Sequence, residues 1–161
     1  MKLYLKQKVF SWSDRFFAKD EAGNDLYAVE GEIFSWGKKL HVYDARGEEA
    51  AFIRQKVFAW RPRYTIEISG RVVCEVVREF TFFRQSYRLE GLSWHLDGDL
   101  WAHEYELTDR GRGIMRLSKQ WFTWGDSYEL DIANERDALL CLCVTLAVDC
   151  AVAAANASHS H

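Results

Sequence analysis

Short segments of alternating apolar and polar residues make up most of this chain, and one long apolar segment follows them. The segments LHVYD (40–44), YTIEIS (64–69) and YELDI (128–132) carry an apolar residue at every second position, as strands with one buried face do. Residues 138–155, ALLCLCVTLAVDCAVAAA, are interrupted only by Thr145 and Asp149. A helix that is apolar on all sides must be covered by protein or by lipid. The pattern predicts about a dozen short strands and one fully covered helix.

An internal repeat organises the strands. KQKVFSW (6–12), RQKVFAW (54–60), FSW (34–36) and SKQWFTW (118–124) resemble one another, and Phe10, Phe34, Phe58 and Phe82 are spaced 24 residues apart. Residues tolerant of positive φ, such as those in Gly23-Asn24, Ser69-Gly70 and Asp97-Gly98, separate the strands,. Each unit reads strand–turn–strand, and hairpins that close into a barrel leave no exposed edges. We therefore expect one domain over residues 1–156 with a tail at 157–161, and no linker within it.

The apolar helix is expected to lie inside that barrel. Asn134 is a predicted N-cap, followed by Glu135 and Asp137 in the first turn, so the helix is placed at 135–155,. The alternative is a membrane span, but Asp149 would then lie in hydrocarbon, and neither Lys or Arg nor an aromatic belt marks the end of the segment,. The fold expected is mostly β (α+β), a closed antiparallel β-barrel of about 12 strands around a central, buried, hydrophobic C-terminal helix. Asp149 would then need a buried polar partner.

Composition and charge narrow the classes of function. The net charge is −3 with 15% aromatic residues, so nucleic acid is not an expected partner. The four cysteines (Cys74, Cys141, Cys143 and Cys150) are expected to be reduced and buried, because three of them lie in the apolar helix,. The N-terminal sequence MKLYLKQKVF has no uninterrupted apolar core of the signal-peptide kind,. We therefore expect a cytoplasmic protein, peripheral at the membrane if lipid is its partner.

One segment carries a resemblance to a known family. Residues 117–132, LSKQWFTWGDSYELDI, followed by the apolar helix, resemble the LURP-one-related proteins of the tubby C-terminal-like superfamily, which also contains the phospholipid scramblases. The resemblance covers essentially the whole chain. It implies a closed antiparallel barrel of about twelve strands around a C-terminal helix. Tubby domains bind phosphoinositides and scramblases move lipids between leaflets, but no lipid-site motif of the superfamily aligns with particular residues here.

Motifs for catalysis or metal binding are weak. The chain contains no GxxxxGK, HExxH, CxxC or GxSxG pattern, so we expect neither an enzyme nor a cofactor,. His95 and His103, which flank Asp97-Gly98 and are followed by Glu104, would form a metal site only if the hairpin arms brought them together,. An ordinary hairpin with outward polar residues is the expected structure. The acidic segment Asp20–Asp25 is likewise expected to be a turn, and we predict no metal site.

Repeated basic residues are the candidate site. Lys6 and Lys8 occupy the same repeat positions as Arg54 and Lys56, and Lys119, Lys38 and Lys39 are expected near the same end of the barrel. With Trp12, Trp36 and Trp60 nearby, such residues suit an anionic headgroup at a membrane interface. The lipid-headgroup candidates are Lys6, Lys8, Arg54, Lys56 and Lys119. The alternatives are a solvated strand edge, in which lysine discourages aggregation, and a protein-interaction or scaffold domain with aromatic hot spots.

Overall fold

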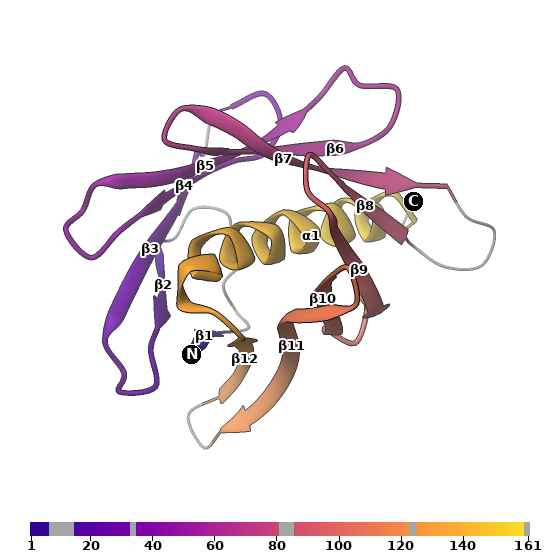
Figure 1. The fold of residues 1–161 in the computed structure, drawn as a ribbon. Helices are drawn as coiled ribbons and strands as arrows, with labels where there is room; N and C mark the ends of the chain where they lie inside the picture. The colour runs from indigo at the N-terminus through magenta and orange to yellow at the C-terminus, as the bar shows by residue number, and fades with distance from the viewer. Residues whose placement is uncertain (7–14, 33–34, 81–85, 123–124, 160–161) are drawn as a thin grey trace.

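Twelve antiparallel strands surround one long helix (Figure 1). The computed structural model describes residues 1–6, 15–32, 35–80, 86–122 and 125–159. The strands are β1 (Lys2–Lys6), β2 (Phe16–Lys19), β3 (Asp25–Gly31), β4 (Lys39–Tyr43), β5 (Glu49–Lys56), β6 (Arg63–Ile68), β7 (Arg71–Glu79), β8 (Ser86–Glu90), β9 (Trp94–Asp99), β10 (Glu104–Asp109), β11 (Arg112–Phe122) and β12 (Gly125–Ile132). A 3₁₀ turn, η2 (Glu135–Asp137), leads into α1 (Ala138–His159).

The strands form one sheet in the order β8-β7-β6-β5-β4-β3-β2-β1-β12-β11-β10-β9. Strands that follow one another along the chain therefore pair with each other, except β8 and β9. In addition, β1 pairs with β12 over all five of its residues, from Lys2 opposite Asp131 to Lys6 opposite Ser127. Backbone hydrogen bonds in both directions between Met1 and Ile132 continue this pairing at the chain's start. The result is a nearly closed barrel whose opening lies between β8 and β9, and the predicted twelve-stranded architecture is confirmed.

Alternation along the strands produces the interior. The buried side chains occupy every second position, and the residues between them face outward. Examples are Leu3 and Leu5 of β1, Leu40 and Val42 of β4, and Leu130 of β12. The second half of the sequence repeat supplies part of this inner face, since Leu40, Tyr64 and Tyr128 all lie six residues after a repeat phenylalanine and are all buried.

The helix α1 fills the barrel. Every residue from Cys141 to Val152 is buried, on all sides of the helix, and Figure 1 shows strands around it. Small side chains such as Ala147 and Ala151 let the wall approach closely. The helical segment Glu135–Ser158 contains an 18-residue window with a mean hydropathy of 2.3, long and apolar enough to cross a bilayer, yet 78% of that window is buried by protein. Protein walls cover this helix, as the alternating strands predicted.

The ends of the helix follow local chemistry. The Asn134 side chain accepts a hydrogen bond from the Arg136 N–H at 3.2 Å, which confirms the predicted N-cap,. The sequence placed the helix end near Ala155, whereas α1 continues to His159. Ser158 lies within this extension, and its hydroxyl donates to the Ala155 carbonyl at 2.8 Å, a local bond that turns and helices both accommodate.

Candidate functional site

Because successive strands run in opposite directions, the connections between them lie alternately on two opposite edges of the barrel. Loops that leave odd-numbered strands lie on one edge, which includes residues 35–38, 57–62 and 100–103. Tight turns that leave even-numbered strands lie on the other, including 20–24, 44–48 and 69–70. The helix enters from the turn edge, after β12, and runs toward the loop edge (Figure 1).

Large exposed apolar side chains concentrate at the loop edge. We call Trp36, Val57, Phe58, Trp60 and Phe80 the aromatic rim; they are 82%, 45%, 93%, 92% and 64% exposed. Trp101, which is 53% exposed, lies in the 100–103 loop of the same edge. Among the described side chains, the other large exposed hydrophobic residues are Phe17 and Val72, which lie on strands. Clustered exposure of this kind marks an interaction surface more often than scattered surface residues do.

Backbone contacts hold the loops of the aromatic rim together. A Cβ built at Gly37, whose φ is +76°, would lie 2.6 Å from Cγ2 of Val57, so the loop before β4 packs directly against the loop after β5. The Gln55 N–H donates to the Lys38 carbonyl at 2.8 Å, and the Lys38 N–H donates to Oε1 of Gln55 at 3.1 Å. The Arg78 N–H donates to the Pro62 carbonyl at 3.0 Å. The rim is thus a continuous surface over β4, β5, β6 and β7.

Two arginines accompany the rim. The guanidinium carbons of Arg61 and Arg78 lie 6.0 Å and 5.9 Å from the centre of the Phe80 ring, within cation–π distance. Within the described ranges, neither arginine forms an ion pair with a carboxylate. Lys56 and Arg63 differ, because both contact Glu75, at 2.7 Å and 2.9 Å.

Lys38 lies on the inner side of this edge. It precedes Leu40 and Val42 at alternate positions, and burial lowers the pKa of its ammonium to about 8, with Cys150 of α1 near enough to oppose the shift,. A cation here lies toward the end of α1 at which helix carbonyls accumulate negative potential.

The predicted headgroup candidates occupy several parts of the wall. Arg54 and Lys56 both point outward from β5, and Arg54 lies opposite Lys39. Lys6 is exposed at the end of β1, four strands away around the sheet. Lys119 follows buried Met115 and Leu117 at alternate positions of β11, so its side chain starts on the inner face,. Lys8, like Trp12, lies outside the described residues.

Asp149 of α1 contacts His103 in the interior of the barrel. Its Oδ1 lies 3.4 Å from Nδ1 of His103, whose ring is tilted by 33° against that of Tyr128 with centroids 4.6 Å apart. Among the described residues, the His103 nitrogen and both Asp149 oxygens are buried without a hydrogen bond. Burial raises the pKa of the Asp149 carboxyl, and the His103 imidazole opposes that shift,. The pair joins the 100–103 loop to the helix.

The predicted histidine hairpin has a different geometry. The turn lies at residues 100–103 and not at Asp97-Gly98, because the Asp99 carboxylate accepts hydrogen bonds from the N–H groups of Trp101 and Ala102, both at 3.0 Å,. His95 faces Thr108 across the β9–β10 ladder, while His103 lies in the loop and contacts Asp149. His95 and His103 are therefore not brought together. Among the described residues, no group of three or more His, Cys, Asp or Glu side chains has metal-binding geometry.

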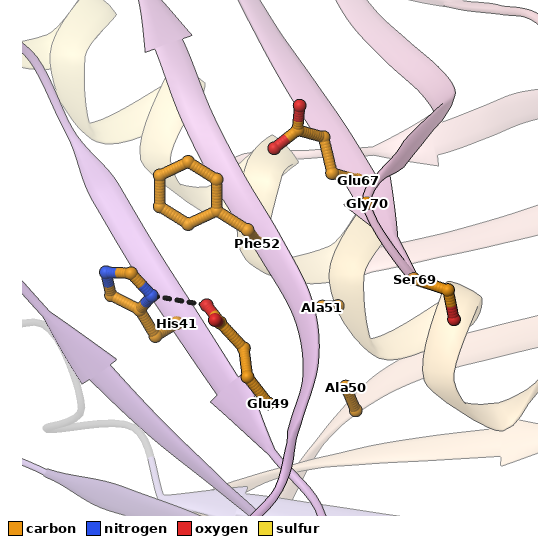
Figure 2. A pocket seen from close by; sticks show the side chains of 8 residues that line it. All are labelled: His41, Glu49, Ala50, Ala51, Phe52, Glu67, Ser69 and Gly70. Carbon is orange, nitrogen blue, oxygen red and sulfur yellow. Dashed lines mark hydrogen bonds and ion pairs between the residues drawn. The ribbon is translucent and has the colours of Figure 1, made fainter.

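A pocket of about 240 Å³ lies on the outer wall of β4, β5 and β6 (Figure 2). The ring of Phe52 stands beside His41, with centroids 4.7 Å apart. The imidazole contacts Glu49 on one side and Glu32, at 2.7 Å, on the other. Burial lowers the pKa of His41, but the two carboxylates outweigh it and the net shift is upward,. This ion-pair network accounts for the polar lining, and it makes His41 an outward-facing residue of the β4 wall.

A second pocket, of about 230 Å³, lies where β1 and β2 diverge. Its apolar lining includes Leu5, Phe16 and Phe17, and Lys6 and Ser127 also face it. No periodicity or motif in the sequence indicated this cavity, because it depends on how two neighbouring strands separate.

Sequence reasoning located the aromatic residues at one end of the barrel but missed Arg61, Arg78 and Phe80 as a group. Arg61 and Arg78 belong to different hairpins, and only the register that places Arg63 opposite Val77 brings them to one ring. The sequence feature that could have indicated this group is that RPR (61–63) and REF (78–80) both lie beside loops of the repeat.

Comparisons with known proteins agree with this architecture. The family model described as LURP-one-related matches residues 1–149. A Bacillus subtilis protein, the uncharacterised YxjI, is 42% identical over 149 residues, which cover 92% of each chain. An Arabidopsis thaliana protein solved by X-ray crystallography has the same fold, with a TM-score of 0.61 and 14% identity over 92% of this chain and 89% of that one.

Proposed function

The chain belongs to the LURP-one-related family, and we propose that this member is a non-enzymatic domain that binds anionic membrane surfaces peripherally through its aromatic rim. The observation that carries the proposal is the exposure of Trp36, Phe58, Trp60 and Phe80 at one edge, beside two arginines without a carboxylate partner among the described residues.

The energetics favour an apolar or interfacial partner for this edge. Removing one large apolar side chain from water is worth roughly 1.5–3 kcal/mol. Tryptophan suits the boundary between headgroups and acyl chains, because its ring is apolar and its indole N–H is polar. Several such rings on one face therefore support shallow insertion into a bilayer surface.

The charges near the rim favour an anionic surface. Arg61 and Arg78 are available to phosphate oxygens, whereas Lys56 and Arg63 are engaged with Glu75. Each basic residue near an anionic bilayer contributes about 1 kcal/mol, and salt screens that contribution. Arg54, Lys56 and Lys39 on the outer wall of β4 and β5 would extend the basic surface.

A protein partner is the alternative occupant of the same rim, because exposed tryptophan and arginine are also typical of protein interfaces. The membrane is preferred because the arginines lie among the aromatic side chains. Vesicle binding separates the two possibilities directly.

The test is co-sedimentation with phosphatidylcholine vesicles, with and without 20–30% phosphatidylserine, a composition of roughly cellular surface potential. We expect binding only to the anionic vesicles, weakened by added salt. Val57→Asp is expected to reduce binding, while Val72→Asp is the matched control, since Val72 is a similarly exposed valine (54%) near the opposite edge. Arg61→Gln and Arg71→Gln form a second matched pair, with Arg71 at the turn edge.

Thermal unfolding of each variant establishes that it is folded. The proposal is wrong if wild type fails to sediment with either vesicle, or if Val57→Asp and Val72→Asp behave alike. Retained binding to a protein partner with no vesicle binding would favour the alternative.

A further inference from the structure

The barrel wall has a gap between β1 and β2. β1 pairs with β12 at all five of its positions but with β2 at Tyr4 and Lys19 alone. A continued ladder would have brought Lys6 opposite Phe17. The strands diverge there instead, and the pocket of about 230 Å³ occupies the divergence.

The lining of this pocket combines apolar side chains with cationic ones. Leu5 is buried on the inner face and Phe16 packs against the core, so the floor of the pocket adjoins the barrel interior. The Phe17 ring forms one side, with Arg15 5.7 Å and Lys19 5.9 Å from its centre.

Of the described side chains, three cations and no carboxylate line the pocket. Arg15 and Lys19 are balanced by neighbouring acids, Glu30 at 3.3 Å and Asp25 in direct contact. Lys6 forms no ion pair with any described residue. Among the described residues, therefore, no carboxylate balances the Lys6 ammonium at this apolar cavity.

A buried polar atom also lies at this pocket. Ser127, opposite Lys6 on β12, is only 1% exposed and lines the cavity, yet its hydroxyl has no hydrogen-bond partner among the described residues. Buried hydroxyls in folded proteins are normally satisfied, so the Ser127 hydroxyl has a hydrogen bond left to make with a group in this pocket.

We propose that this gap between β1 and β2 binds a single-chain anionic amphiphile, an alkyl chain with a carboxylate or phosphate head. The chain lies against Leu5, Phe16 and Phe17, and the head accepts hydrogen bonds from the Ser127 hydroxyl and the Lys6 ammonium. The cavity is smaller than the roughly 300–1,000 Å³ typical of drug-sized ligands, which suits one short chain and not a two-chain lipid. The site lies between β1 and β2, whereas the aromatic rim lies over β4 to β7, and it does not depend on the proposed membrane function.

Calorimetric titration with hexanoate, heptanoate and octanoate, all monomeric in solution and without vesicles, tests the proposal. Affinity is expected to rise about fourfold with each added methylene until the cavity is full. 1-Octanol is expected to bind more weakly than octanoate, and octyl phosphate compares a phosphate head with a carboxylate. Amide chemical-shift changes should centre on Leu5, Lys6 and Phe17.

Two pairs of measurements make the test specific. Lys6→Gln is expected to weaken octanoate binding two- to fivefold, whereas Lys2→Gln, which changes the same charge on the same face of β1, is not. Ser127→Leu fills the cavity and is expected to abolish binding; its thermal unfolding is compared with that of wild type. The proposal is overturned if wild type shows no saturable binding of octanoate or octyl phosphate. It is equally overturned if octanol binds as tightly as octanoate, or if Lys6→Gln and Lys2→Gln are the same.

Discussion

At the scale of single residues, the contact between His103 and Asp149 stands out because it places an ionisable group inside an apolar core. His103 has a φ of +56° in the loop before β10, a conformation that histidine tolerates better than most side chains. The Asp149 carboxyl is 4% exposed and its oxygens lack hydrogen bonds. Nothing in the sequence revealed its partner, because the loop and the helix position are 46 residues apart (149 − 103).

Replacing Asp149 by asparagine is expected to raise the free energy of unfolding at pH 7.5. Burial raises the pKa of this carboxyl above its ordinary 3.8, so the folded state holds the proton more tightly than the unfolded state. The stability that this group contributes is therefore present below pH 3.8 and is lost as the pH rises through the folded pKa. Asparagine does not ionise, so the variant avoids this loss of stability at high pH.

Urea unfolding at pH 7.5 and pH 4 measures the effect. The advantage of Asp149→Asn should narrow at pH 4. Asp97→Asn, at an exposed position of β9, is the control and should change little at either pH. An Asp149→Asn protein that is less stable than wild type at pH 7.5 would show that the ionised pair with His103 stabilises the fold.

At the scale of elements, the helix α1 was predictable and the details of one hairpin were not. An apolar run with an Asn cap specifies a helix whatever covers it, because the signal is local. The sequence predicted the turn between β9 and β10 at Asp97-Gly98, whereas the structure has it at 100–103. Gly98 lies within β9, where the backbone of β10 comes so close that no side chain fits. A Cβ at Gly98, whose φ is +136°, would lie 2.5 Å from the Glu104 carbonyl oxygen. Glycine marks both situations in a sequence, and only the pairing register distinguishes them.

Val144→Asp in the middle of α1 is expected to abolish cooperative folding. Val144 is 0% exposed, and an unpaired carboxylate there costs about 4 kcal/mol or more, a large share of a typical domain's stability. Ala154→Asp is the matched change at an exposed position of the same helix and should leave a folded protein. Near-ultraviolet circular dichroism and thermal scans compare the two. Soluble, cooperative unfolding of Val144→Asp would contradict a helix enclosed by strands.

At the scale of the whole molecule, the barrel could be predicted because three independent signals agreed: alternation in the strands, a 24-residue repeat and a helix that required a cover. The basic candidates were less predictable. Equivalent repeat positions place residues near one edge, but the strand order separates Lys6 from Arg54 by four strands, and alternation turns Lys119 inward. Their role in headgroup binding stays a prediction.

Removing residues 138–161 is expected to leave a chain that cannot fold. The strands' inner faces would lose Leu142, Leu146 and their neighbours, which are fully buried, and an empty barrel of this width has no other filling. Size-exclusion chromatography and proteolysis should find aggregated or protease-sensitive protein. If the shortened chain were instead the one that remains soluble and compact without detergent, lipid and not protein would be the natural cover of the helix.

The order of the elements, with α1 after all twelve strands, has a consequence for biosynthesis. The strand that pairs with the first strand, β12, and the segment that fills the interior are synthesised only after the other eleven strands. Until α1 has left the ribosome, the apolar faces of the nascent hairpins have no helix to pack against, and such surfaces are prone to aggregation. The barrel can therefore close only once α1 is available, and we expect chaperones that protect the strands before that point to raise the yield of native protein.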